Sequence, residues 1–187
     1  MIREENSRML SQVENILTIS QLERSSNPFD MEKTNIHEVI EDAIEHLRLI
    51  VESNKGSINI NLNANNSYIL GNSNNLENII INILDNAVKY SRSKPIIIVS
   101  TKNIGDSIEL CVQDNGIGMD KNTQKMIFEK FYREQNGDIH DIKGHGLGLS
   151  YVKKIVDFHK GKIMLESQKD SGTKFYINFK TLKDEIR

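Results

Sequence analysis

NNLENIIINILDNAVKY, residues 74–90, is the stretch with the clearest periodicity in the chain. Its apolar residues recur at every third or fourth position, which predicts a long helix with one buried stripe. The stripe consists of Leu76, Ile79, Ile80, Ile83, Leu84, Ala87 and Val88. Asn82, Asn86 and Lys89 are spaced i, i+4 and i+7 and therefore share another face of this helix. That face is either solvated surface or a site in which amide oxygens hold a hard metal ion and lysine contacts phosphate.

The residues before this helix predict a second helix and three extended segments. Asn35 and Glu38 form a capping-box pattern, which starts a helix over residues 36–52. Its inward residues are predicted to be Val39, Ile40, Ala43, Leu47 and Ile50, and Lys55-Gly56 ends it. Alternation predicts a strand over 57–62, and shorter extended segments are predicted at 29–33 and 68–70.

The residues after the helix predicted over 74–90 predict four strands, a loop and a further helix. The strands are 96–102, 107–113, 162–167 and 173–179, and the helix is 147–159. Residues 115–145 are predicted to form mostly a long loop. Helices and strands are interspersed without strict alternation. This favours an α+β fold, a two-layer α/β sandwich whose mixed sheet is covered on one face by helices.

One further helix is predicted over residues 4–24, and Pro28 separates it from the rest. Met9, Leu10, Val13, Ile16 and Leu17 form its apolar stripe. Two interpretations remain open: the helix docks on the domain behind it, or it is a piece of a helical bundle.

Composition restricts the class of protein. The chain has 187 residues and a formal net charge of -2, which gives no indication of nucleic-acid binding. Its single cysteine, Cys111, excludes an internal disulfide and favours a reducing, cytoplasmic setting. The longest apolar runs are too short to cross a bilayer.

Two glycine-rich motifs flank the predicted loop. DNGIGM, residues 114–119, follows a predicted strand, and its acidic residue and glycines fit either an ordinary turn or a ligand site. GHGLGL, residues 144–149, opens the late helix, whose free N–H groups could bind phosphate. It matches neither the dinucleotide fingerprint nor the Walker P-loop.

Taken together, the motifs are much more specific than each is alone. The pattern N-x-x-x-N-A-x-K-Y of residues 82–90 is followed by DNGIGM, by FEKFYR at 128–133 and by GHGLGL. This order closely resembles the N box, first glycine box, F box and second glycine box of sensor histidine kinases. Their ATPase superfamily also includes gyrase, certain heat-shock chaperones and mismatch-repair ATPases. The resemblance covers about residues 28–181 and implies the Bergerat-type ATP-binding fold.

The resemblance implies that ATP and Mg²⁺ are the cofactors. Asp114 would accept a hydrogen bond from the adenine amine, supported by Thr173. Asn86 would coordinate Mg²⁺ with Asn82 beside it. Lys89 and Tyr90 would face the phosphates or ribose, and Gly116 and Gly118 would make room for the base and sugar.

The resemblance also assigns a lid over the nucleotide. Phe128 and Phe131 would anchor it, and Arg133 would reach phosphate. Gly144, Gly146, Leu147 and Gly148 would hinge the lid and offer N–H groups to phosphate. His145 stands where a small hydroxyl residue is usual, and His159-Lys160-Gly161 replaces a more common His-Gly-Gly.

Asn82 indicates which branch of the superfamily this is. Hydrolysing relatives and anti-sigma serine kinases carry a glutamate there as a general base, and an amide cannot accept a proton in that way. A histidine acceptor needs less activation, so Asn82 and Lys89 fit a histidine kinase as its catalytic residues. The alternatives are a non-catalytic nucleotide-binding scaffold and an anti-sigma serine kinase.

The resemblance divides the chain into two parts. Residues 1–26 resemble the second helix of a dimerisation domain, and residues 27–187 form the catalytic ATP-binding domain. In the full-length kinase this domain would phosphorylate a histidine of the dimerisation domain, in the same or the partner subunit. The acceptor is absent here, so self-phosphorylation is not expected. The implied partners are that domain and a response regulator, without nucleic acid. The full-length protein would be a homodimer, with this chain alone a cytoplasmic monomer and its parent anchored in the inner membrane.

Overall fold

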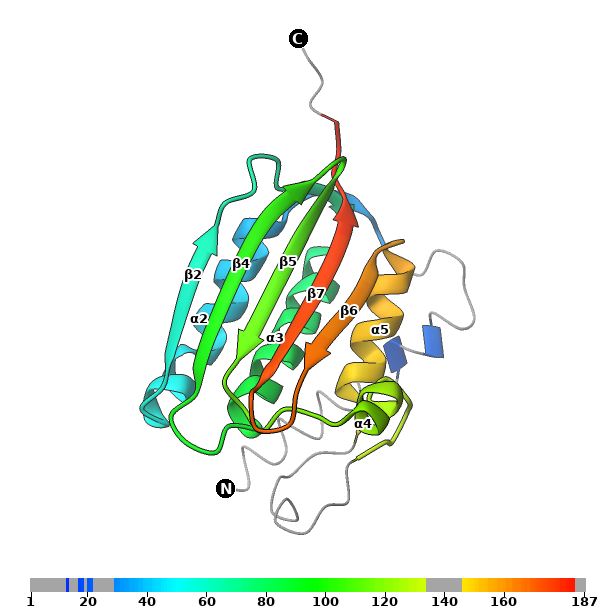
Figure 1. The fold of residues 1–187 in the computed structure, drawn as a ribbon. Helices are drawn as coiled ribbons and strands as arrows, with labels where there is room; N and C mark the ends of the chain where they lie inside the picture. Colours follow the sequence, from blue (N-terminus) through cyan, green and yellow to red (C-terminus); the bar gives the residue numbers. More distant parts are fainter. Residues whose placement is uncertain (1–12, 14–16, 19, 22–28, 134–145, 184–187) are drawn as a thin grey trace.

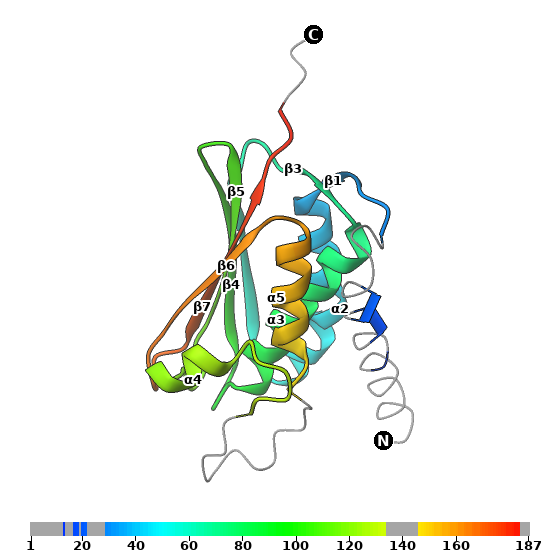
Figure 2. The ribbon, with the colours of Figure 1, turned by 90° about the vertical axis from the view of Figure 1, so that its right-hand side faces the viewer.

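The computed structural model describes residues 13, 17, 18, 20, 21, 29–133 and 146–183. Within them the chain forms a five-stranded sheet with helices on one face and a two-stranded sheet at one end (Figures 1 and 2). The predicted two-layer α+β architecture is therefore confirmed. Val13, Leu17, Thr18, Ser20 and Gln21 are helical, and the rest of the helix predicted over 4–24 lies outside the described residues.

Eleven elements follow one another along the described residues. They are β1 (Glu32–Asn35), α2 (Ile36–Ser53), β2 (Ser57–Leu62), β3 (Tyr68–Gly71), α3 (Ser73–Lys89), β4 (Ile96–Ile104), β5 (Ser107–Asp114), α4 (Lys121–Met126), α5 (Gly148–Phe158), β6 (Lys162–Ser167) and β7 (Thr173–Lys180).

The main sheet has the strand order β2-β4-β5-β7-β6. Strands β2 and β4 are parallel, and every other neighbouring pair is antiparallel, so the sheet is mixed as predicted. The segment predicted at 68–70 is indeed a strand, but it pairs antiparallel with β1 in the small sheet. The extended segment predicted at 29–33 corresponds to β1, which begins and ends slightly later in the chain than predicted.

Helices α2, α3 and α5 lie side by side on one face of the sheet (Figure 2). Between them and the sheet lies one apolar core, to which α3 contributes its predicted stripe. The Asn35 side chain accepts a hydrogen bond from His37 N–H and donates one to Glu38, so the predicted cap of α2 forms. The inward position of Ile50 was predicted wrongly: its side chain is 46% exposed, and Val51 is buried in its place.

Residues 115–145, predicted to form mostly a long loop, contain a helix that was not predicted. Residues 121–126 form the short helix α4, which begins where the Asp120 side chain accepts hydrogen bonds from the N–H groups of Asn122 and Thr123. Aspartate is a favoured residue at this capping position. A helix of this length shows too little apolar periodicity to be recognised in a sequence.

Different segments of the chain lie at the two ends of the main sheet. At one end, β1, β3 and the residues after β7 meet: Leu182 N–H donates to the Tyr68 carbonyl at 2.8 Å. At the opposite end, the last residue of β5 (Asp114) and the first of β7 (Thr173) lie near the C-terminus of α3 and the N-terminus of α5 (Figures 1 and 2). This second end carries most of the residues that the sequence motifs single out.

Candidate functional site

One face of α3 carries the three polar residues predicted from their spacing. Asn82 is half-buried, and its amide nitrogen donates to the Asn78 carbonyl at 2.7 Å. Asn86 is also half-buried, and among the described residues no hydrogen bond engages its side chain. Lys89 forms an ion pair with Asp85 one turn earlier. The amide oxygen of Asn86 is therefore available to a ligand, whereas Lys89 would have to leave Asp85 to contact phosphate.

The N-terminus of α5 faces this helix. No side chain caps α5 at Leu147, so within the described residues its first N–H groups are left for a ligand. A Cβ atom placed on Gly148 would lie 2.7 Å from Asn82 Oδ1. Only glycine therefore lets the Asn82 side chain and the start of α5 meet. The N box and the second glycine box, far apart in sequence, come together here.

Gly146, in the second glycine box, packs against the backbone of residues 131 and 132. Gly146 has a φ of +69°, and an added Cβ would lie 2.7 Å from the Tyr132 carbonyl oxygen. Its own carbonyl accepts a hydrogen bond from Phe131 N–H at 2.9 Å. Leu147 is buried. Gly144 and His145 lie outside the described residues.

Asp114 ends β5 at the same edge. Its Oδ1 atom accepts hydrogen bonds from Gly116 N–H at 2.7 Å and from Thr173 N–H at 3.1 Å. Burial raises the pKa of the Asp114 carboxyl group above its usual value, and the two backbone hydrogen bonds oppose that shift. Among the described residues Oδ2 has no hydrogen-bond partner. One carboxylate oxygen is thus used to fix the side chain, and the other remains for a ligand.

The glycines of the first glycine box allow close packing of the backbone. A Cβ on Gly118, which has a φ of +63°, would lie 1.9 Å from the Gln168 carbonyl oxygen. One on Gly116 would lie 2.8 Å from both Asp114 Oδ1 and the Tyr90 carbonyl oxygen. At both positions a neighbouring segment of the chain lies too close to leave room for any side chain. Their predicted roles toward the base and sugar, and that of Tyr90, stay predictions.

Sequence reasoning missed two residues that connect this region. Ser167, the last residue of β6, accepts a hydrogen bond from Met119 N–H at 2.8 Å. Gln124 of α4 donates to the carbonyls of both Met119 and Ser167, at 2.9 and 2.8 Å. Helix α4, the first glycine box and the β6–β7 hairpin are thereby tied together. Neither residue belongs to a motif, and only the register of β6 against β7 brings Ser167 to this place.

The F box residues lie differently from the prediction. Ile127 is buried and Phe128 packs against the core, but Phe131 is 68% exposed and has a φ of +65°. Phe131 is therefore not an anchor, and that prediction was wrong. Tyr132, the next residue, is instead half-buried against the core. Arg133 is exposed, and its contact with phosphate stays a prediction.

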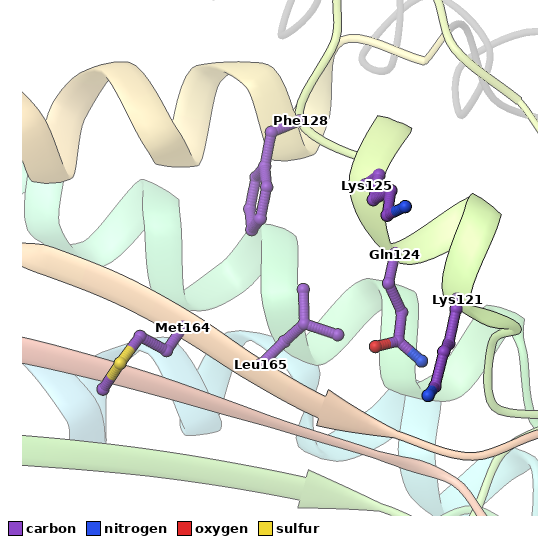
Figure 3. Close-up of a pocket in the computed structure, with 6 residues that line it drawn as sticks. All are labelled: Lys121, Gln124, Lys125, Phe128, Met164 and Leu165. Carbon is purple, nitrogen blue, oxygen red and sulfur yellow. The ribbon is translucent and has the colours of Figure 1, made fainter.

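A groove of about 370 Å³ lies beside this region, between α4 and the edge strand β6. Figure 3 shows Lys121, Gln124 and Lys125 of α4 on one side and Met164 and Leu165 of β6 on the other, with Phe128 near the end of α4. Phe128 is the one predicted lid residue in its lining. The groove adjoins the end of the sheet that carries Asp114 but does not include Asp114 or the α3 face.

Comparison with known proteins agrees with this geometry. Residues 71–183 match the model of the family described as "Histidine kinase-, DNA gyrase B-, and HSP90-like ATPase". The chain belongs to this ATPase family. The match includes all the described residues of the predicted site, from Asn82 to Thr173, and the predicted resemblance to the ATP-binding domain of sensor histidine kinases is confirmed.

Individual members of the family include sensor kinases. Sensor protein RprX of Bacteroides fragilis is 40% identical over 187 residues, which cover 99% of this chain and 36% of the relative. The mycobacterial sensor histidine kinase MprB superposes with a TM-score of 0.68 at 27% identity, covering 81% of this chain and 97% of that one. The histidine kinase ThkA, solved with the response regulator protein TrrA, superposes with a TM-score of 0.75 at 19% identity, covering 98% and 50%. The chain thus spans about a third of RprX.

Proposed function

We propose that this chain is the ATP-binding catalytic unit of a sensor histidine kinase, residues 27–187, preceded by part of a dimerisation-domain helix in residues 1–26. In the longer protein it would transfer the γ-phosphoryl group of ATP to a histidine of the dimerisation domain and release ADP. One observation carries the proposal. The Asn82–Asn86 face of α3, the uncapped start of α5 and the Asp114 carboxylate lie at one end of the sheet.

The residues at this end fit ATP with Mg²⁺. Asp114 offers a free carboxylate oxygen to the adenine amine, and the N-terminal N–H groups of α5 suit phosphate oxygens. The Asn86 amide oxygen suits a hard cation, and Asn82 lies beside it. Among the described residues no group of three or more His, Cys, Asp or Glu side chains could hold a metal by itself. The metal would therefore bind together with the phosphates, whose charge it would neutralise during transfer.

The described histidines support an acceptor outside this chain. His37 Nε2 lies 2.9 Å from Thr101 Oγ1, and His46 Nδ1 lies 2.9 Å from Glu77 Oε1. His159 Nδ1 lies 2.8 Å from the Ile155 carbonyl, and its Nε2 accepts from Asn72 N–H at 3.1 Å. Each of these rings is engaged in a structural contact away from the Asp114 end. His140 and His145 lie outside the described residues.

Family membership and the relatives support the remaining parts of the proposal. RprX and MprB are sensor kinases by name, and ThkA was solved with a response regulator. We therefore infer two-component signalling, a response regulator partner and a homodimeric full-length protein. No helix within the described residues is long and apolar enough to span a membrane. Anchoring of the parent protein in the inner membrane and a cytoplasmic position for this unit remain part of the proposal.

Titration calorimetry with ATP and Mg²⁺ tests the proposal directly. Replacement Asp114→Ala should weaken ATP binding by about 1–3 kcal/mol, because the adenine amine loses its acceptor. Asp106→Ala is the matched control, since Asp106 is an exposed carboxylate near the other end of the same strand. Unchanged affinity in a folded Asp114→Ala protein would reject the adenine role. No ATP binding by the unaltered chain would reject the proposed function. ATP binding without phosphoryl transfer to a dimerisation domain that carries the acceptor histidine would favour the non-catalytic nucleotide-binding scaffold.

A further inference from the structure

Three polar side chains form a row across the end of the sheet. Ser167 of β6 is the register partner of Thr173 of β7. Asp114 of β5 follows the pair Gln113–Lys174 and therefore comes next to Thr173 on its other side. Each of the three lies two residues from a core-packed residue of its own strand, so all three point to the helix-covered face of the sheet. The row Asp114–Thr173–Ser167 thus crosses three adjacent strands at the end where we place the nucleotide.

The hydroxyl group of Ser167 is surrounded by three partners. Met119 N–H donates to Ser167 Oγ at 2.8 Å. The Gly172 carbonyl oxygen lies 2.9 Å from Oγ and can only accept, so it takes the single hydroxyl proton. Thr173 Oγ1 also lies 2.9 Å from Oγ. Because Ser167 has no second proton, the Thr173 hydroxyl must donate to it.

This arrangement fixes the direction of the Thr173 hydroxyl. Its proton points to Ser167, and only its lone pairs remain for another partner. Next to it, Asp114 holds Oδ1 against Thr173 N–H and keeps Oδ2 as an acceptor. The two neighbouring side chains therefore present acceptors alone. Such a pair favours a ligand group that donates, and it repels a group that accepts.

We infer that Ser167 is a positioning residue for purine selection: by fixing the Thr173 hydroxyl as an acceptor, it favours a 6-amino purine over a 6-oxo purine. This inference rests on the proposed binding of ATP at Asp114. Ser167 does not contact the base but acts through Thr173. Without the Ser167 hydroxyl, Thr173 can turn its proton toward the ligand and donate to a 6-oxo group.

The experiment compares ATP with inosine triphosphate, which differs in the purine ring alone and carries a carbonyl at position 6. Calorimetry with Mg²⁺ gives the ratio of the two affinities for the unaltered chain and for Ser167→Ala. We expect Ser167→Ala to bind ATP about fivefold more weakly, the size of one hydrogen bond, and inosine triphosphate no more weakly than the unaltered chain. The ATP preference should therefore fall by about the same factor. Ser167→Thr, which keeps the hydroxyl group, should restore it.

Two further variants separate selection from simple loss of structure. Ser100→Ala removes a hydroxyl from the opposite face of the sheet, where Ser100 pairs with Cys111, and should leave both affinities unchanged. Thr173→Val removes the acceptor itself at nearly constant volume and keeps the backbone N–H that holds Asp114. It should lower the ATP preference as Ser167→Ala does, and it decides the question if Ser167→Ala does not fold.

The outcomes distinguish this inference from the proposed function. If both nucleotides lose affinity equally in Ser167→Ala or in Thr173→Val, the row has a structural role only and the inference is wrong, while ATP binding stands. If the unaltered chain binds ATP and inosine triphosphate equally well, selection at this row is excluded. If it binds neither nucleotide, the proposed function and the inference fall together.

Discussion

At the scale of single residues, Asn86 is the side chain whose state in the fold most directly suggests a ligand. It is half-buried on α3, and among the described residues no hydrogen bond engages its amide. Polar groups inside a fold are normally hydrogen-bonded, so an unengaged amide on the same helix face as Asn82 is a candidate for a ligand contact.

Asn86→Ala should therefore weaken binding of Mg²⁺-ATP more than binding of ATP in the presence of a chelator. Losing one oxygen ligand should cost about 1–3 kcal/mol with the metal and little without it. Calorimetry under the two conditions measures both values. Asn74→Ala, an exposed asparagine at the other end of α3, is the control and should change neither. Equal losses under both conditions would remove Asn86 from the metal site.

The positions of some site residues could be predicted from the sequence, and those of others could not. The shared face of Asn82 and Asn86 follows from helix geometry alone, because both lie in one continuous helix. Ser167 belongs to no motif, and its contacts depend on how β6 pairs with β7. Phe131 was assigned as an anchor by resemblance, but it has a positive φ and is largely exposed. Local periodicity is readable in a sequence, whereas strand register and single backbone angles are not.

At the scale of elements, α2 and α5 end in the same way. Lys55 and Lys160 adopt φ values of +56° and +54°, and each is followed by a glycine. The N–H groups of Gly56 and Gly161 donate to the carbonyls of Val51 and Val156, both at 2.9 Å. This is the Schellman arrangement, in which glycine is the usual residue at the position that both lysines occupy.

Lys160→Gly should therefore stabilise the protein by about 0.5–1 kcal/mol, because relief of left-handed backbone strain outweighs the added freedom of the unfolded chain. Lys55→Gly should behave likewise, since both side chains are exposed. Urea denaturation provides the free energies of unfolding. Lys162→Gly, an exposed position in regular strand β6, should instead destabilise by about 0.5–1 kcal/mol. A destabilised Lys160→Gly protein would contradict this explanation.

The bounds of the helices and strands were predicted better than the pairing of the strands. Strong periodicity made α3 and α5 recognisable almost to the residue, and the capping residues of α2 were visible in the sequence. Helix α4 was missed because six residues cannot establish a period. The small sheet of β1 and β3 was not anticipated, since pairing between distant strands leaves no local pattern.

At the scale of the whole molecule, the proposed function places the catalytic unit and its phosphate acceptor in separate domains. The described histidines are held by contacts within the fold, and the stretch that resembles a dimerisation helix contains no histidine. We therefore expect the chain alone to bind ATP without labelling itself.

Incubation with γ-labelled ATP and Mg²⁺ should yield no acid-labile, base-stable phosphate on this chain. Addition of a separate dimerisation domain with an intact acceptor histidine should give weak labelling of that domain, because the effective concentration supplied by a covalent tether is lost. Replacement of that acceptor histidine by glutamine is the control and should abolish the label. Stoichiometric phosphohistidine on the isolated chain would show that the acceptor lies within it.

The arrangement of β1, β3 and the residues after β7 has a consequence for how the unit can be handled and reused. The polypeptide enters through β1, which pairs with β3, and leaves beside β3, where Leu182 contacts Tyr68. Adjacent entry and exit points are the condition under which a domain can be inserted into a loop of a host protein or circularly permuted. Both connections lie at the pole of the molecule opposite Asp114. Unrelated host proteins could therefore be joined to this unit at both connections without obstructing the end of the molecule that carries Asp114, Asn86 and Gly148.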